Sequence, residues 1–163
     1  MNKKKKSTFS VHYLTAAAII AALYVVLTFL SAAFGLASGV IQLRLSEALA
    51  VLPFFTPAAV PGVTIGCFLA NLLTGSPVYD VIFGTLATFL GVFGAALLKR
   101  HPFLIALPTI LSNALIIPLV LQLAYGVPDA IWYLILTVGL GELLSAGVLG
   151  TLLLQLIKKR KLL

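Results

Sequence analysis

Residues 42–75 have the sequence QLRLSEALAVLPFFTPAAVPGVTIGCFLANLLTG, which is mostly apolar and is interrupted by prolines. Its two charged residues, Arg44 and Glu47, lie near its start, and almost all other positions are apolar or small. Prolines between residues 53 and 61 interrupt the apolar run, and proline ends or kinks a helix. The stretch therefore predicts two short helices, at residues 41–55 and 60–74, joined by a tight turn.

Longer apolar runs flank this stretch on both sides. They are separated by Gly35, by the turn residues 75–77, by the loop 99–102 and by the turn residues 126–129. Each run approaches or exceeds the roughly 20 residues of a membrane-spanning helix. The remaining predicted helices cover residues 14–34, 78–98, 103–124 and 130–157. The predicted fold class is all-α: a polytopic membrane protein with six transmembrane helices.

The composition indicates that lipid is the solvent for most of the chain. Hydrophobic residues make up 61% of the 163 residues and charged residues 9%, whereas charged residues reach about a quarter in soluble domains. A soluble fold of this size could not bury that much apolar surface in one core. The single cysteine, Cys67, lies inside an apolar run and is expected to be a small packing residue.

The net charge of +7 is concentrated in three clusters, at residues 3–6, 99–100 and 158–161. Cytoplasmic loops collect Lys and Arg, and six spans place all three clusters on one side of the membrane. Both termini are therefore expected in the cytoplasm. The predicted organisation is a basic N-terminal segment (1–12), one six-helix transmembrane domain (13–157) and a basic tail (158–163). Anionic lipid is the expected contact of these clusters, and nucleic acid is excluded because no folded basic face remains.

Missing motifs exclude several enzyme classes. His12 and His101 lie at membrane edges, without the paired histidine and carboxylate spacing of a zinc site. The G-x-x-x-x-G-K-[ST] sequence that cradles nucleotide phosphates does not occur. Serines near the membrane have no positioned histidine base. The sequence therefore predicts no catalytic residue, no metal and no cofactor.

Five charged residues lie away from the basic clusters, and ionisable groups at membrane depth usually serve function. Arg44 and Glu47, three residues apart, can pair directly on one helix, which is a structural alternative to a binding role. Asp80 either caps the fourth helix or belongs to a site, and Asp129 is expected to cap the last helix. Glu142 lies about 18 Å along that helix, near mid-membrane. It has no charged partner within a turn, so it requires either a ligand or a tertiary hydrogen bond.

Uncharged polar and aromatic residues predict a cavity open to the outer face. Asn71 and Gln122 lie near the outer ends of their helices, and Asn113 lies deeper. The aromatic residues at the same level either form an interfacial belt or stack on a planar ligand. They are Tyr79, Phe83, Tyr125, Trp132 and Tyr133.

Small residues recur every four positions in the first helix, as Ala17 with Ala21 and Ala18 with Ala22. Such stripes let another backbone approach closely. Internal packing explains most stripes of this kind. This helix begins at the cytoplasmic surface, so we expect its stripes to dock a partner protein.

These features together resemble a known family. A six-helix membrane protein of this size, with lysine-bounded ends and an Ala-x-x-x-Ala stripe, resembles the substrate-binding S components of energy-coupling factor (ECF) transporters. The stretch quoted above, followed by YDVIFGTLATFLG at residues 79–91, is similar to the QueT family of S components for queuosine precursors. The resemblance covers residues 14–156 and is most specific at residues 42–91.

The resemblance implies a subunit of an ATP-driven importer in a bacterial plasma membrane. Its implied partners are a transmembrane coupling (T) component and two ABC-type ATPases, and its implied ligand is a 7-deazaguanine such as preQ1, bound near the outer surface. Carboxylates suit the N–H donors and ammonium of such a ligand. We expect Glu47 to bind the base edge, Asp80 or Glu142 the ammonium, and Arg44 to orient Glu47. The complete predicted substrate-binding set is Arg44, Glu47, Asn71, Tyr79, Asp80, Asn113, Trp132 and Glu142.

Other functions fit the same sequence. A free-standing secondary transporter would use Glu142 as a proton site, and an S component could also take a different vitamin-like substrate. A membrane structural protein would have no ligand at all. Ligand-dependent stabilisation of the purified chain separates these hypotheses.

Overall fold

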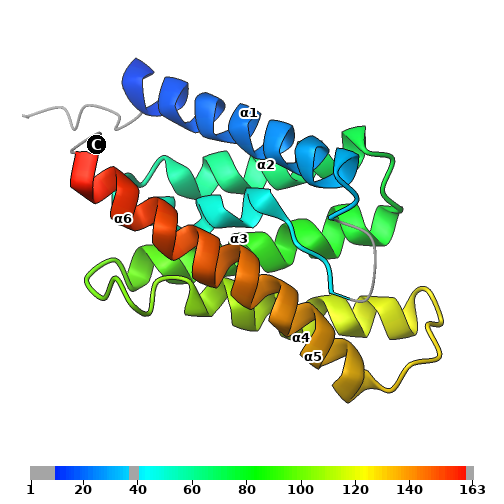
Figure 1. Ribbon diagram of the computed structural model, residues 1–163. Helices are drawn as coiled ribbons and strands as arrows, with labels where there is room; N and C mark the ends of the chain where they lie inside the picture. The colour runs from blue at the N-terminus through cyan, green and yellow to red at the C-terminus, as the bar shows by residue number, and fades with distance from the viewer. Residues whose placement is uncertain (1–9, 37–40, 161–163) are drawn as a thin grey trace, which may run out of the picture.

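The computed structural model describes residues 10–36 and 41–160, which are helical apart from their turns and loops. Residues 3–6 of the predicted basic segment and residue 161 of the predicted tail lie outside the described residues. Figure 1 shows the helices packed side by side as one bundle. The elements are α1 (Val11–Ala33), the 3-10 helix η1 (Leu45–Phe54), α2 (Ala59–Leu73), the π-helix η2 (Asp80–Gly84), α3 (Thr85–Leu97), α4 (Leu107–Leu123), α5 (Ile131–Glu142), the π-helix η3 (Leu143–Leu149) and α6 (Gly150–Arg160).

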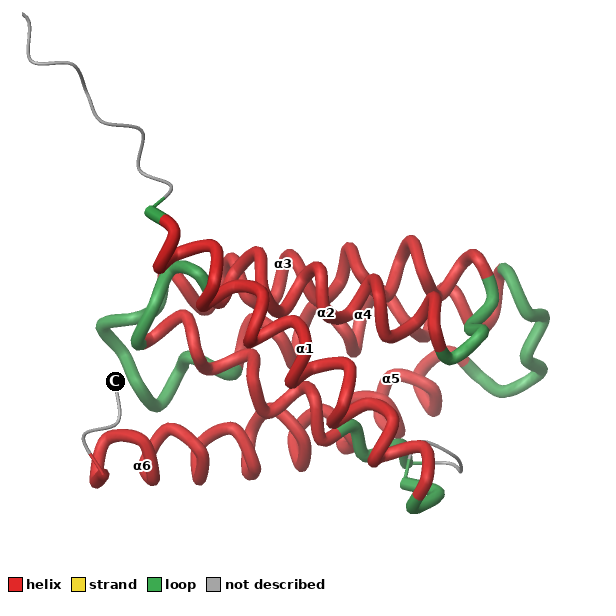
Figure 2. The backbone as a smooth tube through the Cα atoms, turned by 90° about the horizontal axis from the view of Figure 1, so that it is seen from above, coloured by secondary structure: helices red, strands yellow, loops and turns green. Residues whose placement is uncertain are grey.

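These elements form six helical runs, because η2 continues into α3, and α5, η3 and α6 form one long helix. Figure 2 shows that long helix passing along one side of the bundle. Three runs are long and apolar enough to cross a membrane: Val11–Ala33, Asp80–Leu97 and Ile131–Arg160. The other three runs are shorter apolar helices. The all-α prediction is therefore confirmed for the described part of the chain.

The second run differs from its prediction at its start. Residues 41–44, expected to be helical, precede the 3-10 helix, which begins at Leu45. Their backbone groups bond to distant segments: the Leu43 N–H donates to the Leu36 carbonyl and the Arg44 N–H to Ser145 Oγ. Pro53 lies near the end of the 3-10 helix. Tertiary hydrogen bonds thus replace the helical bonds that the local sequence predicts.

The first helix packs closely on the third run, which corrects part of the predicted docking surface. Ala17 and Ala21 are buried, and Cβ atoms added at Gly62 and Gly66 would lie 2.8 and 3.0 Å from their carbonyl oxygens. This small-residue stripe therefore serves the contact between α1 and α2. Ala18 and Ala22 are exposed, so only these two remain available to a partner.

The ends of the helices agree with the predicted glycine breaks but not with the predicted aspartate caps. Gly35, Gly75 and Gly126, the predicted breaks, have positive φ and follow α1, α2 and α4. Neither aspartate acts as a helix cap. The Asp80 N–H already donates to the Pro77 carbonyl, so Asp80 lies within the first turn. Ala130, rather than Asp129, is the N-cap of α5. Both carboxylates are therefore available for other contacts.

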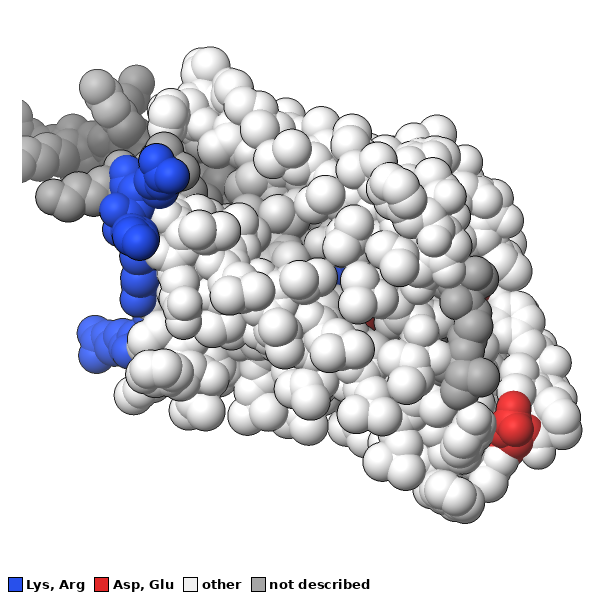
Figure 3. All heavy atoms as spheres, viewed as in Figure 1, with Lys and Arg blue, Asp and Glu red and all other residues white. Residues whose placement is uncertain are grey.

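The buried core surrounds the 3-10 helix and α2. Ala50, Ala59, Val63 and Cys67 belong to one buried cluster, in which Cys67 is 1% exposed. Cys67 is therefore a packing residue, as predicted. Figure 3 shows most of the described Lys and Arg residues gathered at one end of the bundle and acidic atoms at the other. The last turn of α6 lies at the same end as the start of α1 (Figure 1).

Candidate ligand-binding site

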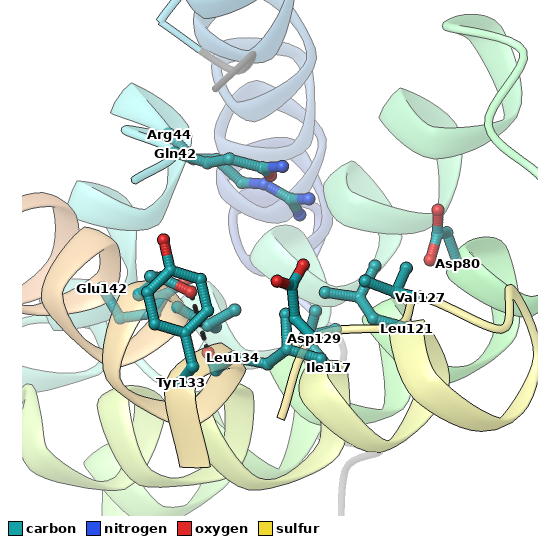
Figure 4. Close-up of a pocket in the computed structure, with 12 residues that line it drawn as sticks. Gln42, Arg44, Asp80, Ile117, Leu121, Val127, Asp129, Tyr133, Leu134 and Glu142 are labelled. Carbon is teal, nitrogen blue, oxygen red and sulfur yellow. Dashed lines mark hydrogen bonds between the residues drawn. The ribbon is translucent and has the colours of Figure 1, made fainter. Parts of the chain in front are cut away.

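A cavity of about 580 Å³ opens among residues 41–44, α4, the loop after α4, and α5. We call it the large cavity. Figure 4 shows the side chains that surround it. Its lining residues are Gln42, Arg44, Asp80, Ile117, Leu121, Val127, Asp129, Tyr133, Leu134, Thr137, Val138 and Glu142.

The charges in the large cavity are unbalanced: three carboxylates, on Asp80, Asp129 and Glu142, face one guanidinium, on Arg44. Glu142 is 7% exposed, whereas Asp80 is partly exposed and Asp129 is exposed. In Figure 4 the Asp129 carboxylate points to the side of the cavity on which the Arg44 guanidinium lies. The site can therefore take a donor-rich or cationic group, with its most buried carboxylate at the deep end.

Two serines from distant elements position Arg44. Its backbone N–H donates to Ser145 Oγ of η3 at 2.9 Å, and the next N–H, of Leu45, donates to Ser31 Oγ of α1 at 2.9 Å. Both serines are 1% exposed. The backbone of Arg44 is thus held between the first and last helical runs.

The two helical runs that carry Asp80 and Glu142 change their hydrogen-bond pattern at these residues. Asp80 is the first residue of η2, and Glu142 immediately precedes η3. π-segments of this kind widen a helix locally and occur often at functional sites. Each widened turn therefore shifts a carboxylate relative to the regular helix, at the position where it faces the large cavity.

Glu47, which was predicted to bind the base edge, lies among buried residues rather than in a cavity wall. It lines neither cavity described here and is 1% exposed. The Tyr24 hydroxyl donates to Glu47 Oε1, while Glu47 Oε2 has no hydrogen-bond partner in the described part of the chain. The expected direct hydrogen bond with Arg44 therefore does not form. Because the 3-10 helix begins only after Arg44, the two residues do not share a helical face.

The two predicted asparagines have different surroundings. Asn71 Nδ2 donates to the Asp80 carbonyl at 3.2 Å, which links α2 to η2. Asn113 is 3% exposed and lies beside Glu142. Asn113 Nδ2 and Glu142 Oε2 both lack hydrogen-bond partners among the described residues. Buried polar atoms are normally bonded, and the Asn113 amide and the Glu142 carboxylate lie close enough to interact with each other.

The predicted aromatic ligands lie outside the large cavity. Tyr79 is 52% exposed and Trp132 63% exposed. Their rings pack edge to face on Tyr125 and Tyr133 respectively. Burial and the nearby Asp80 carboxylate raise the pKa of Tyr125. Tyr133, not Trp132, lines the large cavity.

A second cavity of about 230 Å³ lies on the other side of Arg44, and we call it the small cavity. Arg44 lines both cavities. The lining of the small cavity is mostly hydroxyl groups and one amide. Its lining residues are Tyr24, Thr28, Ser31, Ala32, Arg44, Ser46, Asn71, Thr74 and Ser76.

Comparison with known proteins places the chain in a family. Residues 14–159 match the family described as "QueT transporter". The chain belongs to the QueT transporter family. This membership, with several apolar helices in one bundle, identifies a multi-pass membrane protein of the transporter class and confirms the resemblance seen in the sequence.

A curated relative of this QueT-family chain is named "Queuosine precursor transporter QueT", from Lactococcus lactis subsp. cremoris (strain MG1363). It is 41% identical over 85 residues, which cover 52% of this chain and 48% of the relative. The match thus spans about half the length of that protein. No solved structure matches the chain.

Sequence reasoning missed several residues of the site in this QueT-family chain. Asp129 was expected to be a helix cap, yet its carboxylate faces the cavity. Ser31 and Ser145 gave no local signal, since each acts on a backbone N–H far away in sequence. Asp129 alone carried a usable signal, because it is one of only four acidic residues in the chain.

Proposed function

We propose that this chain is the substrate-binding membrane subunit of an ATP-driven ECF-type importer. Its ligand is a 7-deazaguanine queuosine precursor of the preQ1 type. The observation that carries this proposal is the large cavity, where three carboxylates and one guanidinium meet between apolar walls. The name of the relative from Lactococcus lactis supports the substrate class.

The cavity chemistry suits such a ligand. A guanine-like edge presents adjacent N–H donors, which one carboxylate accepts as a bidentate pair. Glu142 is the best candidate because it is the most buried carboxylate and its Oε2 has no partner within the described chain. The aminomethyl ammonium then meets Asp80 or Asp129 near the mouth. Ile117 and Leu121 supply apolar surface for the ring.

The proposed orientation puts the large cavity toward the outside. Lys and Arg collect on cytoplasmic loops, and the described cations other than Arg44 lie at one end of the bundle (Figure 3). With six spans, both termini lie in the cytoplasm, and the helix start that carries Asp80 and the loop that carries Asp129 face outward. The exposed residues Ala18 and Ala22 are the proposed contact for the T component, which in turn binds two ABC-type ATPases.

Ligand-dependent thermal stabilisation of the purified full-length chain tests the proposal. We expect 7-aminomethyl-7-deazaguanine to raise the melting temperature at micromolar concentration, because a ligand stabilises the state that it binds. Adenine at the same concentration is the control and should have no effect. No shift with any 7-deazaguanine would contradict the proposed substrate.

One observation favours a second function, a proton-coupled secondary transporter: the buried Glu142 carboxylate has an oxygen without a partner in the described part of the chain. Uptake into proteoliposomes that contain this chain alone separates the two functions. A proton gradient should drive no uptake if ATPase partners are required. Uptake driven by the gradient alone would support the second function.

A further inference from the structure

Four of the six hydroxyl groups that line the small cavity donate their protons to other protein groups. Ser31 donates to the Leu27 carbonyl, Thr28 to the Tyr24 carbonyl, and the Tyr24 hydroxyl to Glu47. Thr74 likewise donates to the Ala70 carbonyl at 2.8 Å. The other two hydroxyl groups, on Ser46 and Ser76, lie 3.0 Å from Thr28 Oγ1 and 3.1 Å from Thr74 Oγ1. A hydroxyl has one proton and two lone pairs, so the four oxygens that have donated their protons can act toward the cavity only as hydrogen-bond acceptors.

Asn71 adds to the same pattern. Its Nδ2 donates to the Asp80 carbonyl at 3.2 Å and contacts Cys67 Sγ at 3.6 Å. Both amide protons are thereby used, and the side-chain carbonyl remains as an acceptor. At about 230 Å³ the small cavity is several times the roughly 30 Å³ that one water occupies in the liquid. The small cavity therefore fits a group that carries donors and a positive charge.

The wall of the small cavity already contains a group with donors and a positive charge, the Arg44 guanidinium. Arg44 lines both cavities and interacts electrostatically with Glu142 on one side and with Glu47 on the other. A guanidinium has five N–H donors and no acceptor. The backbone of Arg44 is fixed through Ser145, so the side chain can rotate from one cavity to the other without moving the chain.

We propose that Arg44 is an internal counter-ion that a cationic ligand displaces from the large cavity into the small cavity. The proposal rests on the proposed function. Without ligand, the guanidinium balances the carboxylates of the large cavity. A ligand ammonium competes for the same carboxylates and repels the guanidinium, and this repulsion is strong where water is excluded. In the small cavity the guanidinium meets the acceptor groups of the wall, and it still interacts electrostatically with the buried Glu47. Arg44 thereby limits the preference for cationic over neutral ligands.

A double-mutant cycle between positions 28 and 44 tests this displacement, using two probes of similar shape. The first is 7-aminomethyl-7-deazaguanine, which is cationic, and the second is 7-cyano-7-deazaguanine, which is neutral. Thr28→Val removes an acceptor of the small cavity without touching the large cavity. We expect it to lower the ratio of cationic to neutral affinity about tenfold, the size of one hydrogen bond to a charged group.

Arg44→Met should raise the ratio of cationic to neutral affinity, because no guanidinium then has to leave the large cavity. Thr28→Val should have no further effect in the Arg44→Met background. Thr64→Val is the matched control: Thr64 also donates to the carbonyl four residues earlier, at 2.8 Å against 2.9 Å for Thr28, and lines neither cavity. It should leave both affinities unchanged.

An unchanged ratio in Thr28→Val would overturn the displacement of Arg44. An equal loss of affinity for both ligands in Arg44→Met would also overturn the displacement, because it would show that Arg44 binds the ligand directly. If Arg44→Met does not fold, the ratio measured with Thr28→Val decides alone. Failure of wild-type protein to bind either probe would instead contradict the proposed function.

Discussion

Two glutamates lie inside this membrane protein, and their neighbours give them different roles. Glu142 lines the large cavity and has one oxygen without a partner among the described residues. Glu47 lines neither cavity and accepts a hydrogen bond from the Tyr24 hydroxyl. Both are carboxylates buried at membrane depth, where an ionisable group is costly. We therefore expect one to bind the ligand and the other to hold α1 against the 3-10 helix.

Glu142→Gln should weaken ligand binding while the protein stays folded. The neutral amide removes a charge-assisted hydrogen bond of about 1.5–3 kcal/mol, which corresponds to roughly ten- to hundredfold in affinity. Isothermal titration of the purified variant with 7-aminomethyl-7-deazaguanine measures the loss. Wild-type affinity in this variant would remove Glu142 from the site.

Tyr24→Phe should lower stability more than it changes ligand affinity. The variant leaves the buried Glu47 carboxyl without the donor of its Oε1, and an unsatisfied buried group costs about 1–3 kcal/mol. Thermal unfolding in detergent checks this expectation. Tyr79→Phe is the control, because Tyr79 is 52% exposed and should tolerate loss of its hydroxyl. Equal stability of the two variants would argue against a structural role for Glu47.

At the scale of elements, the segment 41–44 is held against α5 by close backbone contact. A Cβ added at Gly141 would collide with the backbone oxygen of Gln42. The same addition at Gly139, two residues earlier on α5, would meet only Ala114 Cβ at 3.7 Å, an ordinary contact. Gly141 therefore lets the segment that carries Arg44 approach the helix that carries Glu142.

Gly141→Ala should lower both stability and ligand affinity, since overpacking typically costs about 1–3 kcal/mol and the segment must move. Gly139→Ala, on the same helix, should change neither. Melting temperature and titration with ligand give the two readouts. If the two variants behave alike, helix propensity rather than the contact with Gln42 governs this position.

The two faces of α1 predict opposite results for leucine substitutions. Ala17→Leu with Ala21→Leu enlarges residues buried against Gly62 and Gly66, so we expect loss of stability and of ligand binding. Ala18→Leu with Ala22→Leu enlarges exposed residues and should preserve both.

The variant with Ala18→Leu and Ala22→Leu should nevertheless abolish ATP-dependent uptake in cells and co-purification with the T component, because larger side chains prevent another helix from approaching closely. Uptake and pull-down assays are paired with a binding assay on purified protein. Normal uptake by the Ala18/Ala22 variant would show that this face contacts lipid instead.

For the whole molecule, the arrangement of charges predicts the topology. Cysteines introduced as Lys99→Cys and Pro128→Cys lie in loops at the two ends of the bundle, and both positions are exposed. In a Cys67→Ala background, a membrane-impermeant maleimide should label Pro128→Cys in intact cells and Lys99→Cys only after lysis. The reverse pattern would invert the proposed orientation.

Much of the fold follows from the sequence alone. Apolar runs, their glycine and proline breaks, and the basic clusters predicted an all-α membrane protein with six helical runs, because in lipid each helix must satisfy its own backbone bonds. These signals are local, so no tertiary information was needed. The same holds for the helix ends at Gly35, Gly75 and Gly126, where only the chain's own conformation matters.

The site depended on contacts between distant segments, which a single sequence does not encode visibly. The first residues of the segment 41–55 do not form the predicted helix, because tertiary hydrogen bonds satisfy their backbone groups. Glu47 accepts a hydrogen bond from Tyr24 rather than pairing with Arg44, and Asp129 lines the large cavity rather than capping a helix. The sequence thus determined which charged residues enter the membrane domain. Only the packing of α1, the 3-10 helix and α5 decided which of them face a common cavity, because their approach is set by small residues and backbone contacts.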